Sequence, residues 1–380
     1  MIRISLYLVT LLLLFSCDKS HGVHIEVEPL TGFPTNEVGY ELGVSGAYAG
    51  VSNGYVILAG GCNFPEEPVY EGGAKRYYSG IYIAPLINSE EPNQLNWVKV
   101  GELPSEVAYG ASIQGDDAVY FVGGMNDIER FKFTLKLSVQ MGQLVIEHLP
   151  DLPFATDNIS GALRSNNLTI SARNSEETYS NQQLTISLAS LSRGWTLGDS
   201  VFESPRVQFI SFVVDSAYCV SSGFFSGDVN LSPKTYADMQ WEVEGKWYVQ
   251  PNSSEVKDLT FTGGSVVDVK DKGVFALGGV NLPIFQEAIT RGHLMNDITL
   301  KDSLSQEHKR YLQHPSSWYR FNDGLYMFNK SQWRWQHIAD SSYFARAGAS
   351  VVPIDDGFLV IGGELKPGVR TPEIVRVRLY

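Results

Sequence analysis

The residues of this chain best suited to chemistry are a glutamate and an arginine that share one short turn. Segment 362–370 reads GGELKPGVR and directly follows the apolar run at 358–361. Proline and glycine bend the segment back on itself, so Glu364 and Arg370 can face the same small molecule. The carboxylate can accept and return a proton, and the guanidinium can hold an anionic group beside it in a bidentate way.

Other polar residues occupy related points of the chain. Asn63 and Asn281 follow glycine pairs at nearly the same offset as Glu364, so their amides could bind hydroxyl groups of a ligand or, equally, cap their own turns. Lys366 lies in the turn itself, where a solvated lysine is as reasonable as a ligand contact. Four further candidates for ligand binding are basic side chains in a loop of the first repeat and in a late insertion: Lys75, Arg76, Arg291 and His293.

The strands that must position these residues recur about every fifty residues. Four apolar runs end in a glycine pair, at 55–59, 119–122, 274–277 and 358–361. Two weaker copies without the pair, at 168–172 and 217–221, fill the gap between the second and third runs. Most units begin with a strand of small residues, and most end with a strand that carries a tryptophan: Trp97, Trp195, Trp247 and Trp335. This pattern resembles the kelch motif, and it predicts an all-β, six-bladed kelch-type β-propeller.

Two units depart from the fifty-residue period, and each departure leads to a structural prediction. The last unit, 347–380, needs an outer strand from elsewhere, and the alternating segment 24–28 is the natural donor, which would close the ring and remove exposed edges. The fifth unit is longer than the period, and the excess is roughly residues 285–319. Within it, residues 303–312 are compatible with a helix, which Pro315 would end. We expect this partly helical insertion in the fifth blade to form a lid or pocket wall.

Composition limits the partners. The 380 residues are 43% hydrophobic, so a large core is feasible, and a net charge of −13 argues against nucleic acid. A small anion would need only a local cationic pocket. The seven histidines lack metal-ligand spacing and no nucleotide-binding loop is present, so we expect neither a metal nor another cofactor. Cys62 and Cys219 are expected to be two separate buried thiols, although an exported protein would permit a disulfide.

The N-terminus is typical of an export signal. Residues 1–16 combine Arg3 with an apolar run too short for a stable membrane anchor, and the sequence Leu-Phe-Ser-Cys at 14–17 resembles a bacterial lipobox. The predicted organisation is a signal peptide at 1–16, a tether at 17–23 lipidated on Cys17, and a propeller at 24–380. The protein would then be an exported bacterial lipoprotein, facing the periplasm or attached to the outer membrane, whose membrane contact is the lipid at Cys17.

Several motifs together resemble the N-acetylneuraminate epimerase (sialic acid mutarotase) family, particularly its cyclically permuted branch. The matching segments are GGELKPGVRT at 362–371, GGVNLPIF at 278–285, AGVSNGYVILAGG at 49–61, EGGAKRYYSGIYI at 71–83 and GELPSEVAYGAS at 101–112. The resemblance covers nearly the whole chain after the leader, and it is weakest over about 153–252. The order of the motifs is rotated, which a propeller tolerates because each blade contacts only its neighbours.

The resemblance implies that Glu364 is the proton acceptor and Arg370 its cationic partner. It also implies a function: interconversion of the α and β anomers of N-acetylneuraminate, a sialic acid, by ring opening and closure. A sialidase is disfavoured because its repeated Asp-box pattern is absent. An alternative from another class remains open, a surface-tethered kelch propeller that binds carbohydrate or protein without catalysis, because a fold alone does not decide function.

Overall fold

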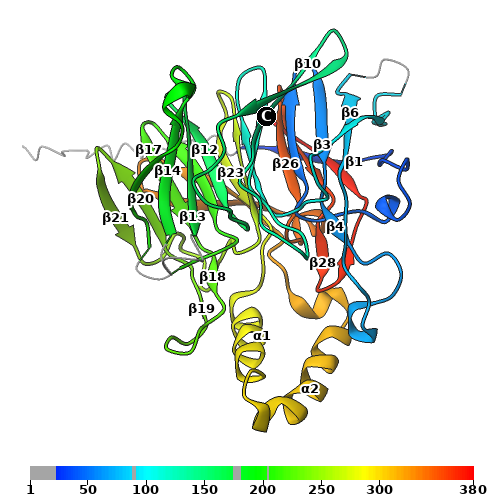
Figure 1. Ribbon diagram of the computed structural model, residues 1–380, viewed down its shortest axis with the longest axis vertical. Coiled ribbons are helices and arrows are strands. Elements are labelled where there is room, and N and C mark those ends of the chain that lie inside the picture. The colour runs from blue at the N-terminus through cyan, green and yellow to red at the C-terminus, as the bar shows by residue number, and fades with distance from the viewer. Residues whose placement is uncertain (1–22, 88–90, 174–180, 203–204) are drawn as a thin grey trace, which may run out of the picture.

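Six four-stranded antiparallel sheets surround one axis in the computed structural model, which describes residues 23–87, 91–173, 181–202 and 205–380 (Figure 1). This arrangement confirms the predicted six-bladed propeller. The predicted signal peptide at 1–16, the lipidation site Cys17 and nearly all of the tether at 17–23 lie outside the described residues.

Each blade is written here from its inner to its outer strand. Blades one to three are β2 (Tyr48–Ser52), β3 (Tyr55–Ala59), β6 (Gly80–Pro85) and β7 (Val98–Glu102); β8 (Ala111–Gln114), β9 (Val119–Val122), β10 (Thr134–Gln140) and β11 (Gln143–Leu149); and β12 (Ser160–Arg164), β13 (Asn167–Arg173), β14 (Asn181–Ser187) and β15 (Thr196–Ser200). Blades four to six are β16 (Ile210–Val214), β17 (Ala217–Ser221), β20 (Met239–Val243) and β21 (Lys246–Gln250); β22 (Ser265–Val269), β23 (Gly273–Leu277), β24 (Gly324–Asn329) and β25 (Arg334–Asp340); and β26 (Ser350–Ile354), β27 (Gly357–Ile361), β30 (Ile374–Leu379) and β1 (Ile25–Leu30).

The N-terminal strand closes the ring as the sequence predicts. β1 pairs antiparallel with β30, so that Ile25 lies opposite Leu379 and Leu30 opposite Ile374. The sixth blade is therefore built from both ends of the described chain, and β30 has no free edge. Packed side chains between neighbouring blades form the core. Among them is Trp335 of the outer strand β25, whose exposed fraction is 1%.

A closed ring of six backbone hydrogen bonds joins the blades two residues before each inner strand. In this ring each N–H donates to the carbonyl of the preceding blade, at N···O distances of 2.7–3.0 Å. All six residues have a left-handed backbone, with φ between 51° and 69°. They are Gly46, Tyr109, Asn158, Gln208, Gly263 and Gly348. Glycine adopts this conformation without steric cost, whereas the other three positions hold a side chain at the mouth of the central channel.

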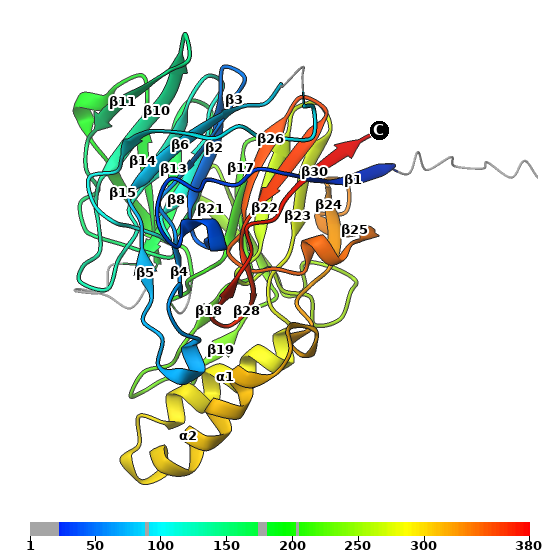
Figure 2. The ribbon, with the colours of Figure 1, turned by 90° about the vertical axis from the view of Figure 1, so that its right-hand side faces the viewer.

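Three short hairpins and the insertion gather at this same end of the propeller. The hairpins are β4–β5 (Cys62–Asn63 and Arg76–Tyr77), β18–β19 (Phe224–Phe225 and Lys234–Thr235) and β28–β29 (Glu364–Lys366 and Val369–Arg370). Helices α1 (Leu282–Leu294) and α2 (Ile298–Gln313) lie beyond them, as two views show (Figures 1 and 2). The 3-10 helices are η1 (Tyr40–Leu42), η2 (Val69–Glu71), η3 (Leu191–Arg193), η4 (Ser316–Tyr319) and η5 (Ser342–Phe344).

The insertion contains one more helix than the sequence predicts. α2 covers the expected segment and ends at Gln313, two residues before Pro315. α1 begins directly after the glycine pair of blade five, where Asn281 accepts a hydrogen bond from the backbone N–H of Ile284 at 3.2 Å. This cap satisfies one of the free donors of the first turn, so the helix can begin beside the blade.

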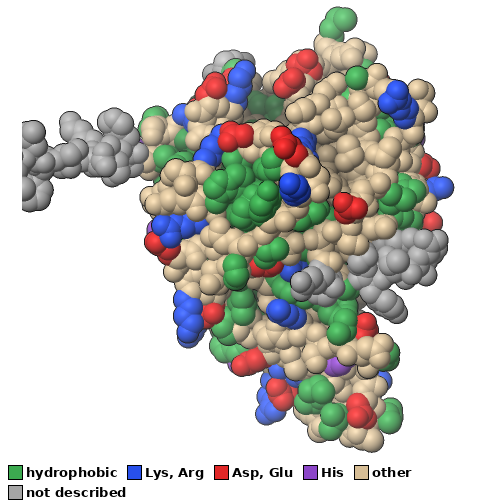
Figure 3. All heavy atoms as spheres, turned by 90° about the vertical axis from the view of Figure 1, so that its left-hand side faces the viewer, with side chains coloured by type: hydrophobic (Ala, Val, Ile, Leu, Met, Phe, Trp, Pro, Cys, Tyr) green, Lys and Arg blue, Asp and Glu red, His purple; other side chains and the backbone are tan. Residues whose placement is uncertain are grey.

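Three further observations concern the surface charges, the helices and the cysteines. Lys, Arg, Asp and Glu side chains are interspersed on the face shown in Figure 3, without a large area of one sign. Of the helices in the described ranges, none has both the length and the apolar character needed to cross a membrane. Cys62 and Cys219 are separate buried free thiols, as predicted.

Candidate active site

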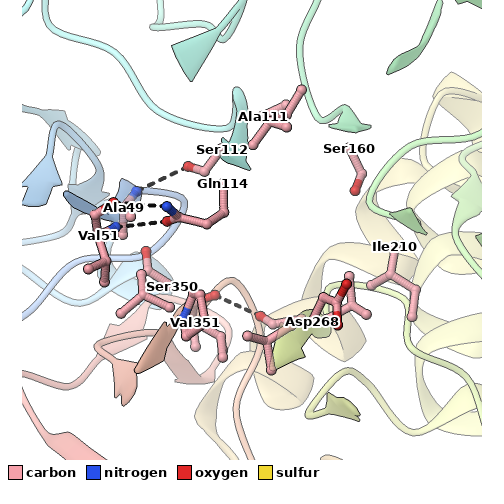
Figure 4. Close-up of a pocket in the computed structure, with 18 of the residues that line it drawn as sticks. Ala49, Val51, Ala111, Ser112, Gln114, Ser160, Ile210, Asp268, Ser350 and Val351 are labelled. Carbon is pink, nitrogen blue, oxygen red and sulfur yellow. Dashed lines mark hydrogen bonds between the residues drawn. The ribbon is translucent and has the colours of Figure 1, made fainter. Parts of the chain in front are cut away.

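A central channel of about 1420 Å³ runs between the six inner strands. Small and hydroxyl-bearing side chains line much of it, and several of them tie neighbouring blades together (Figure 4). The side chain of Gln114, for example, bonds to both the N–H and the carbonyl of Val51, at 2.8 Å each. Glu364 and Tyr109 both line this channel, so the predicted base lies at a cavity and does not point into bulk solvent.

The hairpin β28–β29 places Glu364 directly opposite Arg370. Arg370 Nη1 forms an ion pair with Glu364 Oε2. The arginine side chain is 3% exposed and the glutamate side chain 22%, so the cation is enclosed while the carboxylate remains accessible. The ring of Phe64 lies 5.3 Å from the guanidinium and covers it. The sequence thus located both members of a close pair.

Burial controls the protonation of this pair. It raises the pKa of Glu364 above the ordinary value of 4.5, although the positive charges of Arg370 and Lys75 and a hydrogen bond from the Gly368 N–H act in the opposite direction. A carboxylate with a raised pKa is a better proton acceptor than a solvated one. Burial alone would lower the pKa of Arg370, but the negative charge of Glu364 raises it by more. The net shift of this pKa is upward, so the arginine stays charged.

A thiol and a phenol adjoin the ion pair. Cys62 Sγ donates a hydrogen bond to Tyr109 Oη at 3.0 Å and also interacts with the side chain of Arg370. The ammonium group of Lys75 lies 5.2 Å from the centre of the Tyr109 ring. The charges of Arg370 and Glu364 both act on the pKa of Tyr109, which burial raises well above 10. Sequence reasoning included Tyr109 in a matching motif, but gave it no role.

The insertion forms a wall beside the pair and is fixed at several points. Lys366 donates hydrogen bonds to the carbonyls of Leu312 and His314, at 3.3 and 2.7 Å, which ties the end of α2 to the β28–β29 hairpin. Tyr319, just after α2, has a pKa raised to about 12 by burial and by the negative charge of Glu364. The insertion therefore comes near Glu364, although none of its described residues lines the central channel.

Arg291 brings a further cation to the insertion. Its side chain forms an ion pair with Glu307 at 2.9 Å, and its guanidinium lies 4.8 Å from the centre of the Tyr311 ring. Because these contacts are within the helical hairpin, Arg291 first of all holds α1 against α2. Its Nε and Nη2 atoms are buried without a hydrogen-bond partner among the described residues.

A model of the N-acetylneuraminate epimerase family matches residues 19–146 and 149–380. The chain belongs to the N-acetylneuraminate epimerase family. Similar relatives are the N-acetylneuraminate epimerases of Salmonella arizonae (25% identical, covering 60% of this chain and 58% of the relative), Salmonella typhi (26%, covering 60% and 57%) and Yersinia enterocolitica (34%, covering 28% and 27%). The solved structure of YjhT is 21% identical, with a TM-score of 0.49 over 61% of this chain and 67% of that one. The chain spans less than three fifths of the length of these epimerases.

Among the predicted ligand residues of this epimerase-family protein, the two asparagines have structural contacts. Asn63 Nδ2 donates to the carbonyls of Gly39 and Gly43 at 2.7 and 2.9 Å, and its Oδ1 accepts from the hydroxyl of Tyr78 at 2.8 Å. Asn281 caps α1, as described above. Asn281 therefore caps its own turn, the alternative that the sequence left open, whereas Asn63 bonds to a separate segment of the chain.

The two basic candidates of the β4–β5 hairpin differ in their surroundings. Lys75 lies beside the rings of Phe64, Tyr77 and Tyr109 and affects the pKa of Glu364, so it belongs to the site. Arg76 is exposed, and its guanidinium lies 5.4 Å from the ring of Tyr78 on the far side of the β4–β5 hairpin. Across the described ranges, no three His, Cys, Asp or Glu side chains are grouped so that they could hold a metal ion.

Proposed function

We propose that this protein is a mutarotase that interconverts the α and β anomers of N-acetylneuraminate. The observation that carries the proposal is the ion pair of Glu364 and Arg370 beside the channel mouth, with a shielded cation and an accessible carboxylate. Membership of the epimerase family supports the choice of sugar.

Arg370 would bind the substrate. N-acetylneuraminate carries a carboxylate on the anomeric carbon, and a guanidinium can bind such a group with two parallel hydrogen bonds. On binding, the substrate carboxylate would share Arg370 with Glu364 and bring the anomeric hydroxyl next to the Glu364 carboxylate. Lys75 adds a second positive charge nearby, so an anion is favoured at this mouth although the whole chain carries a net charge of −13.

Glu364 would act as the base. It takes the proton of the anomeric hydroxyl while the bond from the anomeric carbon to the ring oxygen breaks, and the ring oxygen gains a proton. The resulting ketone rotates, and closure on its other face reverses both proton transfers. No proton or electron is gained or lost overall, so the reaction needs no cofactor.

The test is the rate at which freshly dissolved or freshly released α anomer equilibrates, followed by proton NMR with and without protein. The Glu364→Gln variant keeps the size and polarity of the side chain but cannot accept a proton, so we expect it to lose the acceleration by at least about 100-fold. Its affinity for the sugar should stay within a few-fold. As a control, Glu26→Gln alters a glutamate that pairs with Arg378 at 3.2 Å on the outer edge of blade six, and should leave the rate unchanged.

Two results would reject parts of this proposal. If Glu364→Gln equilibrates the anomers as fast as the parent, another group is the base. If the parent protein binds the sugar without accelerating equilibration, the protein is a non-catalytic binding propeller.

The proposed site of action rests on the N-terminal sequence. We infer that the protein is exported and held at a membrane by a lipid on Cys17, where it would meet sialic acid outside the cytoplasm. Incorporation of labelled palmitate into the parent and its loss in Cys17→Ser would support the anchor. Equal labelling of the two would reject it.

A further inference from the structure

Ring opening needs a second proton transfer that Glu364 alone does not supply at the same moment. While the carboxylate removes the proton of the anomeric hydroxyl, the ring oxygen must gain one. A group that stays protonated at neutral pH, reaches the same cavity and can bear a transient negative charge would fit this need.

Tyr109 meets these requirements. Its side chain lines the channel together with Glu364. Tyr109 is one of the six residues of the ring of backbone hydrogen bonds, and its φ of 61° is uncommon for a residue other than glycine. Its ring packs against Gly46, where an added Cβ would lie 2.6 Å from the tyrosine ring, so there is little room for the ring to move.

The surroundings of the Tyr109 hydroxyl suit a proton donor. Cys62 Sγ lies 3.0 Å from the phenolic oxygen, and its thiol hydrogen can also reach the carbonyl of Ser45 at 3.7 Å. Over the described ranges, this weakly accepting sulfur is the one acceptor found for the phenolic hydrogen. That hydrogen is therefore available to a ligand. A phenolate formed by its loss would lie close to the positive charge of Lys75 and to that of Arg370, which lowers the pKa of the phenol, whereas Cys62 raises it.

The geometry points to Tyr109 as a second catalytic residue, the acid that protonates the ring oxygen while Glu364 deprotonates the anomeric hydroxyl. Cys62 is a positioning residue that holds the phenol through its contact with the phenolic oxygen at 3.0 Å. This inference rests on the proposed mutarotase function and assigns a role that the Glu364 and Arg370 pair leaves unfilled.

The proton transfers balance. On opening, Glu364 takes the hydroxyl proton, the carbonyl forms, the electron pair of the broken carbon–oxygen bond goes to the ring oxygen, and that oxygen takes the proton of Tyr109. The intermediate state is an open-chain ketone with a neutral Glu364 and a Tyr109 phenolate. On closure the phenolate takes its proton back from the attacking hydroxyl, and Glu364 returns its proton to the carbonyl oxygen.

The decisive variant is Tyr109→Phe, which removes one oxygen atom and keeps the ring that packs against Gly46. We expect kcat for mutarotation to fall about 100-fold with KM within about threefold. The matched control is Tyr48→Phe: Tyr48 belongs to the inner strand β2 of blade one, but it is fully buried and its hydroxyl donates to the backbone carbonyl of Gly123. That variant should keep its kcat.

Two further measurements separate catalysis from structure. Cys62→Ala should lower kcat several-fold, and Cys62→Ser, which retains a donor, should restore most of it. Site-specific replacement of Tyr109 by 3-fluorotyrosine, a more acidic phenol of nearly the same shape, should change kcat without changing the melting temperature. A purely structural tyrosine would not respond to phenol acidity.

The outcomes distinguish this inference from the proposed function. If the parent accelerates equilibration, Glu364→Gln does not, and Tyr109→Phe retains the parental kcat, then Tyr109 is not the acid and the mutarotase proposal stands. If the parent itself gives no acceleration, both proposals are overturned. A loss in Tyr109→Phe that appears only in KM would also reject the acid role.

Discussion

Blades one and six place different chemistry at the same point of the backbone. Cys62 and Glu364 each follow a glycine pair, and each begins a two-stranded hairpin. Each also forms an isolated β-bridge to the residue just before a member of the ring of backbone hydrogen bonds. In blade one the residue opposite is Tyr77, and in blade six it is Arg370. The first pair is uncharged and buried, whereas the second is an ion pair with an accessible carboxylate.

This contrast shows how a repeating fold can carry a single active site. Among the blades in which the structure describes this position, three others have Met125, Phe224 and Val280 there. The backbone therefore offers equivalent positions around one mouth, and the side chains decide which of them is reactive. Cys62 and Glu364 lie in adjacent blades, so the proposed base and the thiol that contacts Tyr109 lie at the same end of the propeller.

Making blade one resemble blade six should cause the largest effect. Cys62→Glu would bury a second carboxylate opposite Tyr77, and the nearby Arg370 is already paired with Glu364, so one of the two carboxylates would lack a partner. We expect a loss of about 3–5 kcal/mol in the free energy of unfolding, as for a buried charge without its partner. Urea denaturation measures it, with Cys62→Ser as the control of similar size. A stability equal to that of the parent would show that this position is more open than its complete burial indicates.

Removing the charge partner in blade six should cost about 2–3 kcal/mol in sugar binding. Arg370→Ala deletes the proposed carboxylate clamp and leaves Glu364 without its ion pair, so the dissociation constant should rise roughly 30- to 150-fold. Arg370→Lys keeps the charge but not the bidentate geometry and should fall in between. Isothermal calorimetry with N-acetylneuraminate gives both values. Unchanged affinity in the alanine variant would remove Arg370 from the binding site.

The sequence predicted that Glu364 and Arg370 lie together because both lie in one hairpin, where six residues of separation give a cross-strand pair. It also located the second strand of every blade, because these strands are continuous apolar runs. It did not identify β16 (Ile210–Val214) as an inner strand, since that segment lacks the small residues of its counterparts. The contact of Cys62 with Tyr109 joins residues in two different blades, and it exists only because the ring of blades brings their ends together.

Asn63 shows the limit of arguing from spacing. Its offset from the glycine pair resembles that of Glu364, but the backbone bridges show that Cys62 is the equivalent residue. Asn63→Ala would leave the carbonyls of Gly39 and Gly43 and the hydroxyl of Tyr78 without their buried partner. We expect a loss of about 2 kcal/mol in stability, with kcat near the parental value at low temperature. A selective loss of sugar affinity with normal stability would instead place Asn63 in the binding site.

The smallest expected effect, and the one that tests the electrostatics of blade six most directly, is a shift in pH dependence. The base must be deprotonated to act, so kcat should fall as the pH drops through the pKa of Glu364, and burial places that midpoint above 4.5. Lys75 lowers this pKa, so Lys75→Met should move the acid limb to higher pH. Lys99→Met, in a surface pair with Glu102 at 3.0 Å, should leave it in place. An acid limb that stayed in place in Lys75→Met would mean that Lys75 does not act on the titrating group and that Glu364 is not the residue whose charge limits the rate.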